Sequence, residues 1–457
     1  MREFSDLGAD ASLASTVAAR RQAREVARNT RLLVLNGGLM FMAMTFVSSD
    51  LVLPAFVQTL STSSVMIGLA GALMRIGWAW PQVFISRLVE PRPRKMPLFL
   101  WAGMARSAVW FLVGTLTFWL GSRQPLLLLG NFMVLYGIAT SMMGMTNVPW
   151  MDVIGKSIPS SARARMFAVR RLVGGGMAML AGVVISFLLS NRSGIDFPYN
   201  YAVLFMLSGA GTALSVWVFA RIREPIQAVN KTRLPLGAYL ASGLRLLKED
   251  PNYRRLCEVQ FLWAFSMMAA PFYVPYAITG YGIEAVYVGV FVAVMQFSSI
   301  FSNVLWAWVG HHRGNQALLV YGTYFLALSI LVPLLTGYVP DRVVTPFSVL
   351  GLHTAINLRI AFYALTFVFS GFATSGMFTG RMTYVLDIAP PERRPTYTSF
   401  MNMFMLPQGL LPILAGTLVA WISYRSMFVI ALLFVPFSVV LAERLRDVRD
   451  HEAEEAA

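Results

Sequence analysis

The stretch from Pro81 to Lys95 reads PQVFISRLVEPRPRK, and in it an apolar run gives way to a dense group of charges. Four basic residues surround a single acidic residue, Glu90, between positions 87 and 95. A basic loop that directly follows a long apolar run is typical of the inner face of a membrane. The number of such runs, and the side of them on which the charges lie, therefore decide the fold class and the orientation.

The composition excludes a water-soluble protein of ordinary kind. The chain has 457 residues, of which 57% are hydrophobic and 13% charged, and its mean hydropathy is +0.62. Soluble chains carry about 25% charged residues, and a bilayer-spanning helix needs about 20 apolar residues. Runs of that length predict an all-α integral membrane protein with twelve transmembrane helices. The predicted spans are 32–57, 65–87, 97–119, 126–150, 167–190, 200–221, 256–279, 285–309, 316–337, 360–386, 398–421 and 426–443.

The basic residues predict the orientation. Of the 37 lysines and arginines, 29 fall in our count on the side of the predicted spans that holds both termini, with Arg170 and Arg171 assigned to an inner loop. This asymmetry is the positive-inside pattern, so we expect a multi-pass protein of the inner (plasma) membrane with both termini in the cytoplasm. The first thirty residues lack the apolar core of a signal peptide. Anionic lipids explain the net charge of +15 without a nucleic-acid partner.

The longest connection between spans divides them six and six. It contains LGAYLASGLRLLKED, whose apolar residues recur at helical spacing and predict an amphipathic helix on the inner surface. The expected organisation is two six-helix bundles with cytoplasmic flanking segments. These units are an N-terminal tail at 1–31, a bundle at 32–221, a linker at 222–255, a second bundle at 256–443 and a C-terminal tail at 444–457.

The two predicted bundles resemble each other in sequence. Many membrane transporters are built from internal repeats, so an alignment of the two six-span halves of the sequence can reveal a repeat. Spans four and ten also end alike, each with an aspartate, then proline, then a basic pair. The repeat predicts two pseudo-symmetric bundles. A shift of 221 residues aligns Val65 with Val286, Gly68 with Gly289, Met74 with Met295 and Arg75 with Gln296.

The loop SRLVEPRPRK (86–95) resembles the GxxxDRxGRK motif of the major facilitator superfamily of transporters. Arg94 and Lys95 match the motif, and Glu90 stands at its aspartate. The motif is degenerate, because Ser86, Pro91 and Pro93 depart from it. In the second half AWVGHHRGN (307–315) keeps only Gly314. Topology, repeat and loop positions extend the resemblance over nearly the whole chain.

The resemblance implies the fold of that superfamily, in which two halves rock about a central cavity. A pathway that must close and reopen requires contacts that break at modest cost, and ion pairs at the cytoplasmic helix ends meet this need. The alternative is that these charges set topology and cap helix ends. The gating candidates are Glu90, Arg94, Asp152, Arg163, Asp387 and Arg394.

Two arginines fall deep within predicted spans. At about 1.5 Å per residue, Arg75 and Arg106 each lie roughly 14 Å from a span end. A cation at this depth costs at least about 2.5 to 3.5 kcal/mol, so we expect a partner or a wet cavity. Counted from Arg31, Asp50 falls near the outer end of span one, and we therefore expect no acidic residue at the depth of Arg75. The resemblance implies a peripheral third span, which favours a structural role for Arg106.

Arg75 is our main candidate for substrate contact, through charge-assisted hydrogen bonds to an anionic group. Asp50 is the candidate for proton coupling, since a carboxyl group that is partly removed from water can alternate between charged and neutral forms. Uniport and anion exchange, which need no carboxylate, remain alternatives. By analogy with the superfamily, spans one, four, seven and ten line the cavity. Further substrate-binding candidates are Asn131, Tyr136, Trp263, Gln296 and Ser370.

The sequence predicts no metal site and no cofactor. One cysteine and four dispersed histidines supply no metal-ligand set, and there is no Walker motif or nucleophile elbow. We expect a monomeric secondary transporter, not an enzyme, that moves a small organic solute of anionic or amphipathic character among membrane lipids, with protons as one option for coupling. The alternative is a transport-inactive relative that acts as an assembly factor or sensor.

Overall fold

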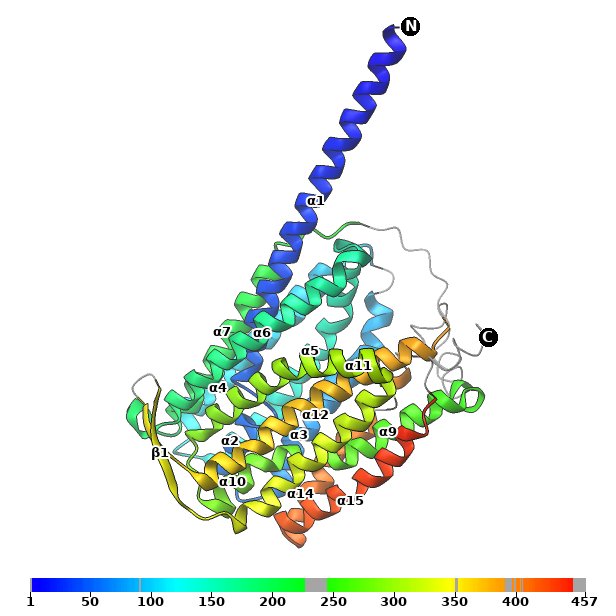
Figure 1. The fold of residues 1–457 in the computed structure, drawn as a ribbon. Helices are drawn as coiled ribbons and strands as arrows, with labels where there is room; N and C mark the ends of the chain where they lie inside the picture. The colour runs from blue at the N-terminus through cyan, green and yellow to red at the C-terminus, as the bar shows by residue number, and fades with distance from the viewer. Residues whose placement is uncertain are drawn as a thin grey trace.

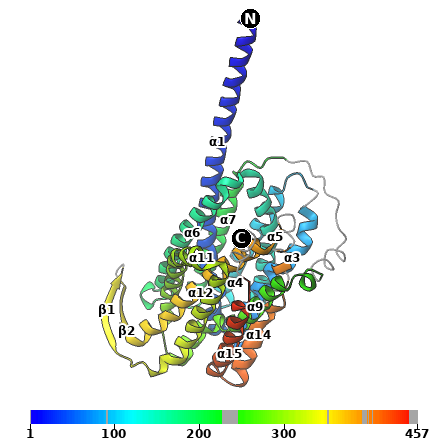
Figure 2. The same cartoon turned by 45° about the vertical axis from the view of Figure 1, so that its right-hand side comes forward.

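A computed structural model of the chain describes residues 2–89, 92–226, 245–349, 352–390, 397, 400–402, 404 and 406–446. It is a bundle of long helices from which the N-terminal part of the first helix projects as a rod (Figure 1; Figure 2). The helices of the first half are α1 (Arg2–Thr45), α2 (Val52–Leu60), α3 (Ser64–Val89), α4 (Met96–Leu120), α5 (Pro125–Ser157), α6 (Ser160–Leu188) and α7 (Tyr199–Phe219).

The second half repeats this arrangement with different helix breaks. Its elements are α9 (Pro251–Met267), α10 (Tyr273–Tyr281), α11 (Tyr287–Leu335), α12 (Leu358–Ile388), the 3-10 helix η4 (Leu406–Leu410), α14 (Leu411–Trp421) and α15 (Tyr424–Glu443). Two predicted spans, eight and nine, lie within α11. They are separated at Gly314, whose φ of 79° and ψ of 170° leave the helical region. Glycine tolerates this positive φ because it has no Cβ.

Span one of each half is broken at the equivalent place. Residues 46–51 separate α1 from α2, and residues 268–272 separate α9 from α10. The helices α2 and α10 begin at Val52 and Tyr273, which are 221 positions apart. This is the shift that aligns the two halves of the sequence, so the repeat extends to the local backbone geometry.

The all-α membrane fold with twelve spans agrees with these helices. Among the described residues, eight helices are long and apolar enough to cross a membrane, and the helix at Tyr287–Tyr338 holds two of the predicted spans. Span eleven contains the shorter apolar helix Gln408–Trp421. The sequence did not predict one element, an antiparallel hairpin of β1 (Val343–Val349) and β2 (Leu352–Asn357), which joins α11 to α12. We call the side of the bundle that carries it the hairpin end, and the opposite side, where α3 finishes and α4 begins, the tail end.

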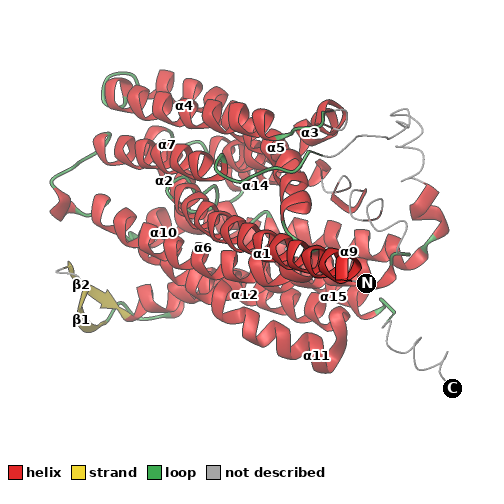
Figure 3. Ribbon diagram, turned by 90° about the horizontal axis from the view of Figure 1, so that it is seen from above, coloured by secondary structure: helices red, strands yellow, loops and turns green. Residues whose placement is uncertain are grey.

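The hydrophobic core is shared at the hairpin end and divided at the tail end. At the hairpin end one cluster joins Val52 and Ile185 of the first half to Val288 and Leu411 of the second. Towards the tail end each half has its own core, one with Leu33, Phe99, Val153 and Phe219, the other with Tyr253, Leu319, Tyr384 and Val439. Viewed from above, α4 and α7 lie on one side and α11 and α12 on the other (Figure 3). The halves are thus sealed together at the hairpin end and have separate cores at the tail end.

Glycines allow this seal to be tight. A methyl group added at Gly289 of α11 would collide with the backbone of Gly182 and Ser186 in α6, and one added at Gly68 of α3 would collide with Pro412 in α14. The Ser186 hydroxyl donates a hydrogen bond of 2.8 Å to the Val286 carbonyl. Small residues let membrane helices approach closely and gain van der Waals contact. These two pairs of helices hold the hairpin end closed.

Candidate functional site

A cavity of about 220 Å³ lies between the halves at mid-depth. The first half supplies most of its walls, from α1, the break after α1, α3, α4 and α5, and the second half supplies the first turns of α11. Its lining residues are Phe41, Met44, Thr45, Val47, Ser48, Ser49, Leu51, Met74, Arg106, Trp110, Tyr136, Ala139, Thr140, Met143, Val292, Met295 and Gln296.

The lining residues recur at helical spacing, because each helix turns one face to the cavity. In α5 this face is Tyr136, Ala139, Thr140 and Met143, and in α11 it includes Val292, Met295 and Gln296. The walls are mostly methionine, aromatic and small side chains, with a few polar groups between them. Such a mixture suits a small ligand, which the apolar wall encloses and the polar groups orient.

Asp50 and Arg75 interact electrostatically beside this cavity. Asp50 lies in the break after α1, ten residues before Leu60 at the hairpin end of α2, and Arg75 lies eleven residues after Ser64, where α3 begins. The two side chains are therefore at similar depth. The expectation that no acidic residue reaches the depth of Arg75 was wrong, because the depth of Asp50 was counted along one unbroken helix that was assumed to end at 57.

Arg75 also lies at the junction of the two halves. A Cβ atom at Gly409 in η4 would be 3.6 Å from the Cβ atom of Arg75. Among the described residues Arg75 has no hydrogen bond and no ion pair within 4.0 Å, and the same holds for Asp50. Both side chains are half-buried. Their charges are close enough to interact but leave their hydrogen-bonding atoms available to a ligand.

Arg106 of α4 and Tyr136 of α5 add two polar groups to the wall that the first half gives the cavity. Arg106 is 5% exposed, and its guanidinium lies 3.5 Å from the sulfur of Met40, a weak acceptor. The buried Tyr136 hydroxyl has no hydrogen-bond partner among the described residues, and its ring stacks on Phe132 at 5.5 Å. Span three is peripheral as expected, since α4 packs on α5 and α7 at the edge of the bundle (Figure 3), but the Arg106 side chain nevertheless lines the cavity. A tyrosine hydroxyl without a partner, beside a guanidinium whose acceptor is weak, gives this wall of the cavity donors that a polar ligand can use.

The remaining substrate candidates divide into two groups. Gln296, which the repeat aligns with Arg75, lines the cavity as Tyr136 does. Asn131 instead donates to the Leu127 carbonyl of its own helix at 2.8 Å. Trp263 and Ser370 lie in α9 and α12 and do not line this cavity.

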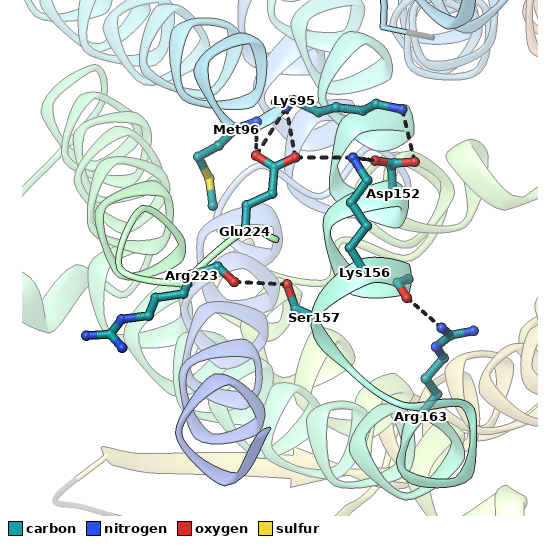
Figure 4. A network of polar contacts seen from close by, with 9 residues as sticks. Lys95, Met96, Asp152, Lys156, Ser157, Arg163, Arg223 and Glu224 are labelled. Atoms are coloured by element: carbon teal, nitrogen blue, oxygen red, sulfur yellow. Dashed lines mark hydrogen bonds and ion pairs between the residues drawn. The ribbon is translucent and has the colours of Figure 1, made fainter. Parts of the chain in front are cut away.

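Two gating candidates lie in or beside a charge network within the first half. Lys95 and Lys156 contact the Asp152 carboxylate at 3.1 and 2.7 Å (Figure 4). Lys156 also lies 3.5 Å from Glu224, and Glu224 accepts hydrogen bonds from the backbone N–H groups of Lys95 and Met96 at the start of α4. Arg163 donates at 2.9 and 2.6 Å to carbonyls at the C-terminal end of α5. This network fastens α4, α5 and the segment after α7 to one another.

The other gating candidates do not join this network. Asp387 accepts a hydrogen bond of 2.6 Å from Asn315, within the second half, and Arg94 is exposed. Glu90 and Arg394 lie outside the described residues. Because the cores of the two halves are separate at the tail end, each described gating candidate bonds within its own half or faces solvent.

The structure offers no obvious metal centre in the part of the chain that it describes, since no three His, Cys, Asp or Glu side chains there are grouped to hold an ion. The free thiol of Cys257 is half-buried in α9.

Comparison with known proteins places the fold. The family model of the Major Facilitator Superfamily matches residues 33–364 and 343–457. A point mutant of the nucleoside transporter NupG is similar in structure, with a TM-score of 0.67 at 14% identity over 91% of this chain and 98% of that one. A D-xylose–proton symporter gives a TM-score of 0.65 at 13% identity over 93% and 98% of the two chains. A POT family transporter in complex with a conjugated peptide gives 0.66 at 10% identity over 91% and 94%. No curated protein sequence matches the chain.

Proposed function

Because the chain belongs to the major facilitator superfamily, we propose that it is a secondary transporter that moves a small organic solute by alternating access. The observation that carries this proposal is the unequal packing of the two halves around the cavity. They share one core at the hairpin end and have separate cores at the tail end. This is the arrangement expected of one of the two end states of a rocking transporter.

We propose that the tail end faces the cytoplasm of a cell whose inner (plasma) membrane holds the protein. The basic residues concentrate in the tail-end connections and in both terminal segments, as the positive-inside pattern requires. In this orientation the structure corresponds to an inward-facing state, and both termini are cytoplasmic.

The pair Asp50–Arg75 suggests how a proton and an anionic solute bind together. When Asp50 is ionised, it competes with a substrate carboxylate for the positive field of Arg75. When Asp50 takes up a proton, Arg75 can form charge-assisted hydrogen bonds with the anionic group of the substrate. Arg106, Tyr136 and Gln296 then bind the rest of the solute in the cavity. This linkage favours symport of one proton with the anion.

Closure of the tail end completes the cycle. We propose that Arg94, Asp387 and the residues near them form ion pairs between the halves when the tail end closes, together with Glu90 and Arg394. Asp152 and Arg163 support this surface by holding the ends of α4 and α5 in place.

The test is uptake by purified protein in proteoliposomes, with an imposed pH gradient and with the gradient collapsed. The solute panel contains nucleosides, pentoses, short peptides and small carboxylic acids, because the similar structures are transporters of several solute classes. We expect flux of at least one organic acid and faster uptake into the more alkaline compartment. If no solute crosses and partner proteins co-purify instead, the transport-inactive alternative is favoured.

A further inference from the structure

We infer that Arg171 and Arg381 form a second anion-binding site, on the tail side of the cavity, that takes a phosphate or carboxylate group between the two halves. Arg171 belongs to α6 in the first half, and Arg381 belongs to α12 in the second. Neither residue lines the central cavity, so the site is additional to the one proposed for transport.

The two arginines meet at a single aromatic ring. The guanidinium carbon of Arg171 lies 5.0 Å from the centroid of the Phe378 ring, and that of Arg381 lies 5.5 Å from it. Because both distances end at one centroid, the guanidinium carbons are at most about 10.5 Å apart. Phe378 is 44% exposed, so a ligand can reach the ring and the cations around it.

The charges of this group are not balanced by the residues around it. In the described part of the chain, no carboxylate forms an ion pair within 4.0 Å with either arginine. The Nε atom of Arg381 is buried without a hydrogen-bond partner. Contact with a ring stabilises a guanidinium but leaves its N–H donors unused. Two neighbouring cations with unused donors, inside a membrane protein, call for an anion that both can bind.

The neighbouring Arg170 also has a buried Nε atom without a hydrogen-bond partner among the described residues, but its surroundings differ from those of Arg171 and Arg381. Its guanidinium lies 4.6 Å from the Trp150 ring and 5.6 Å from the Phe41 ring, both within its own half. Its side chain also fills the space over Gly37, where an added methyl group would collide with it. Arg170 therefore packs between α1, α5 and α6 and holds these three helices together. Arg171 instead reaches a ring of the opposite half, where a bound anion would connect the halves.

The source of the anion is either a soluble solute or the headgroup of an anionic lipid, and the experiment separates them. For the soluble source, the purified protein is placed in nanodiscs of phosphatidylcholine and its thermal unfolding is followed as inorganic phosphate or succinate replaces chloride at constant ionic strength. We expect a saturable rise in the unfolding temperature. Arg171→Gln and Arg381→Gln should each weaken the apparent affinity by about tenfold or more, because charge-assisted bonds are lost.

For the lipid source, the nanodiscs contain phosphatidylglycerol, and native mass spectrometry counts the lipids that remain on the released protein. Loss of one retained lipid in Arg171→Gln and in Arg381→Gln, with no response to phosphate or succinate, assigns the site to a lipid phosphate. The matched control is Arg165→Gln, an exposed arginine of the same helix. Arg171→Lys and Arg381→Lys keep the charge and should retain part of the binding, which separates lost binding from faulty folding.

The inference is overturned if neither probe responds to the two glutamine variants, or if Arg165→Gln weakens binding as much as they do. Both readouts measure binding without transport. If anion binding is not detected, the proposed transport function is unaffected. If transport is not detected, anion binding at this site can still be measured.

Discussion

Asp50 and Arg75 lie on different helical segments of the first half, at similar depth, and interact electrostatically without closing into an ion pair of 4.0 Å or less. A carboxylate and a guanidinium held near each other in this way can each bind another partner. The carboxylate can take up a proton, and the guanidinium can then bind an anion. We therefore expect Asp50→Asn to abolish uptake driven by a pH gradient but to preserve exchange of solute at equilibrium, because the neutral amide imitates the protonated carboxyl group.

The measurement is uptake and counterflow in proteoliposomes over a range of pH. Asp196→Asn, a neutralised acid in an exposed connection at the hairpin end, is the matched control. Gradient-driven accumulation by Asp50→Asn with the pH dependence of the unmodified protein would remove Asp50 from the coupling mechanism.

Arg75→Ala should weaken binding of the transported anion. Loss of a hydrogen bond to a charged group costs about 1.5 to 3 kcal/mol, so the affinity should fall roughly ten- to hundredfold. Arg75→Lys should recover part of it, since lysine keeps the charge but not the planar donor geometry. Titration calorimetry on purified protein measures the effect, with Arg123→Ala at the exposed hairpin end as control. Equal affinities in all three variants would contradict a substrate role.

Gly289→Ala should shift the protein away from the state described above. The added methyl group collides with the backbone of α6 only while the hairpin end is closed, so it destabilises that state relative to one in which the halves part there. Labelling of a cysteine placed at the hairpin end should become faster. Gly176→Ala is the control, because its methyl group meets open space. Unchanged labelling of Gly289→Ala would mean that the helices adjust without parting.

Glu224→Ala should lower the stability of the first half. The carboxylate is 4% exposed in its side chain and accepts bonds from two backbone N–H groups at the start of α4. Its removal should cost about 1 to 2 kcal/mol, as for loss of a helix cap. Glu25→Gln breaks the exposed pair with Arg223 and should cost less than about 1 kcal/mol. Thermal unfolding in detergent compares the two, and similar losses would contradict the structural role of the network.

The spans and the repeat could be predicted from the sequence because they depend on the length of apolar runs and on the distribution of charge. Gly314 was expected in the loop between spans eight and nine, and the structure shows it separating them. The depth of Asp50 could not be predicted from the length of the apolar run. The helix is broken at 46–51, and this segment contains no proline that would predict the break. Arg170 and Arg171 were counted with the inner-loop charges although they fall within predicted span five, and the structure places both within α6 against aromatic rings.

The cavity was only partly predictable. A search for polar residues finds Tyr136 and Gln296 but also Asn131, whose amide bonds to its own helix. Most of the wall is methionine and aromatic, as at Met143 and Trp110, and such residues have the same character as ordinary helix packing. Their helical spacing can be recognised in the sequence. Which face of each helix is turned towards the other half of the protein cannot be predicted from it.

The shared core at the hairpin end gives the conformational equilibrium a thermal signature. Parting the halves there would expose Val52, Ile185, Val288 and Leu411 to water, and exposure of apolar surface raises the heat capacity. Apolar contacts weaken on cooling. The free-energy difference between the two end states should therefore vary nonlinearly with temperature. Cooling should favour the state in which the hairpin end is open to water.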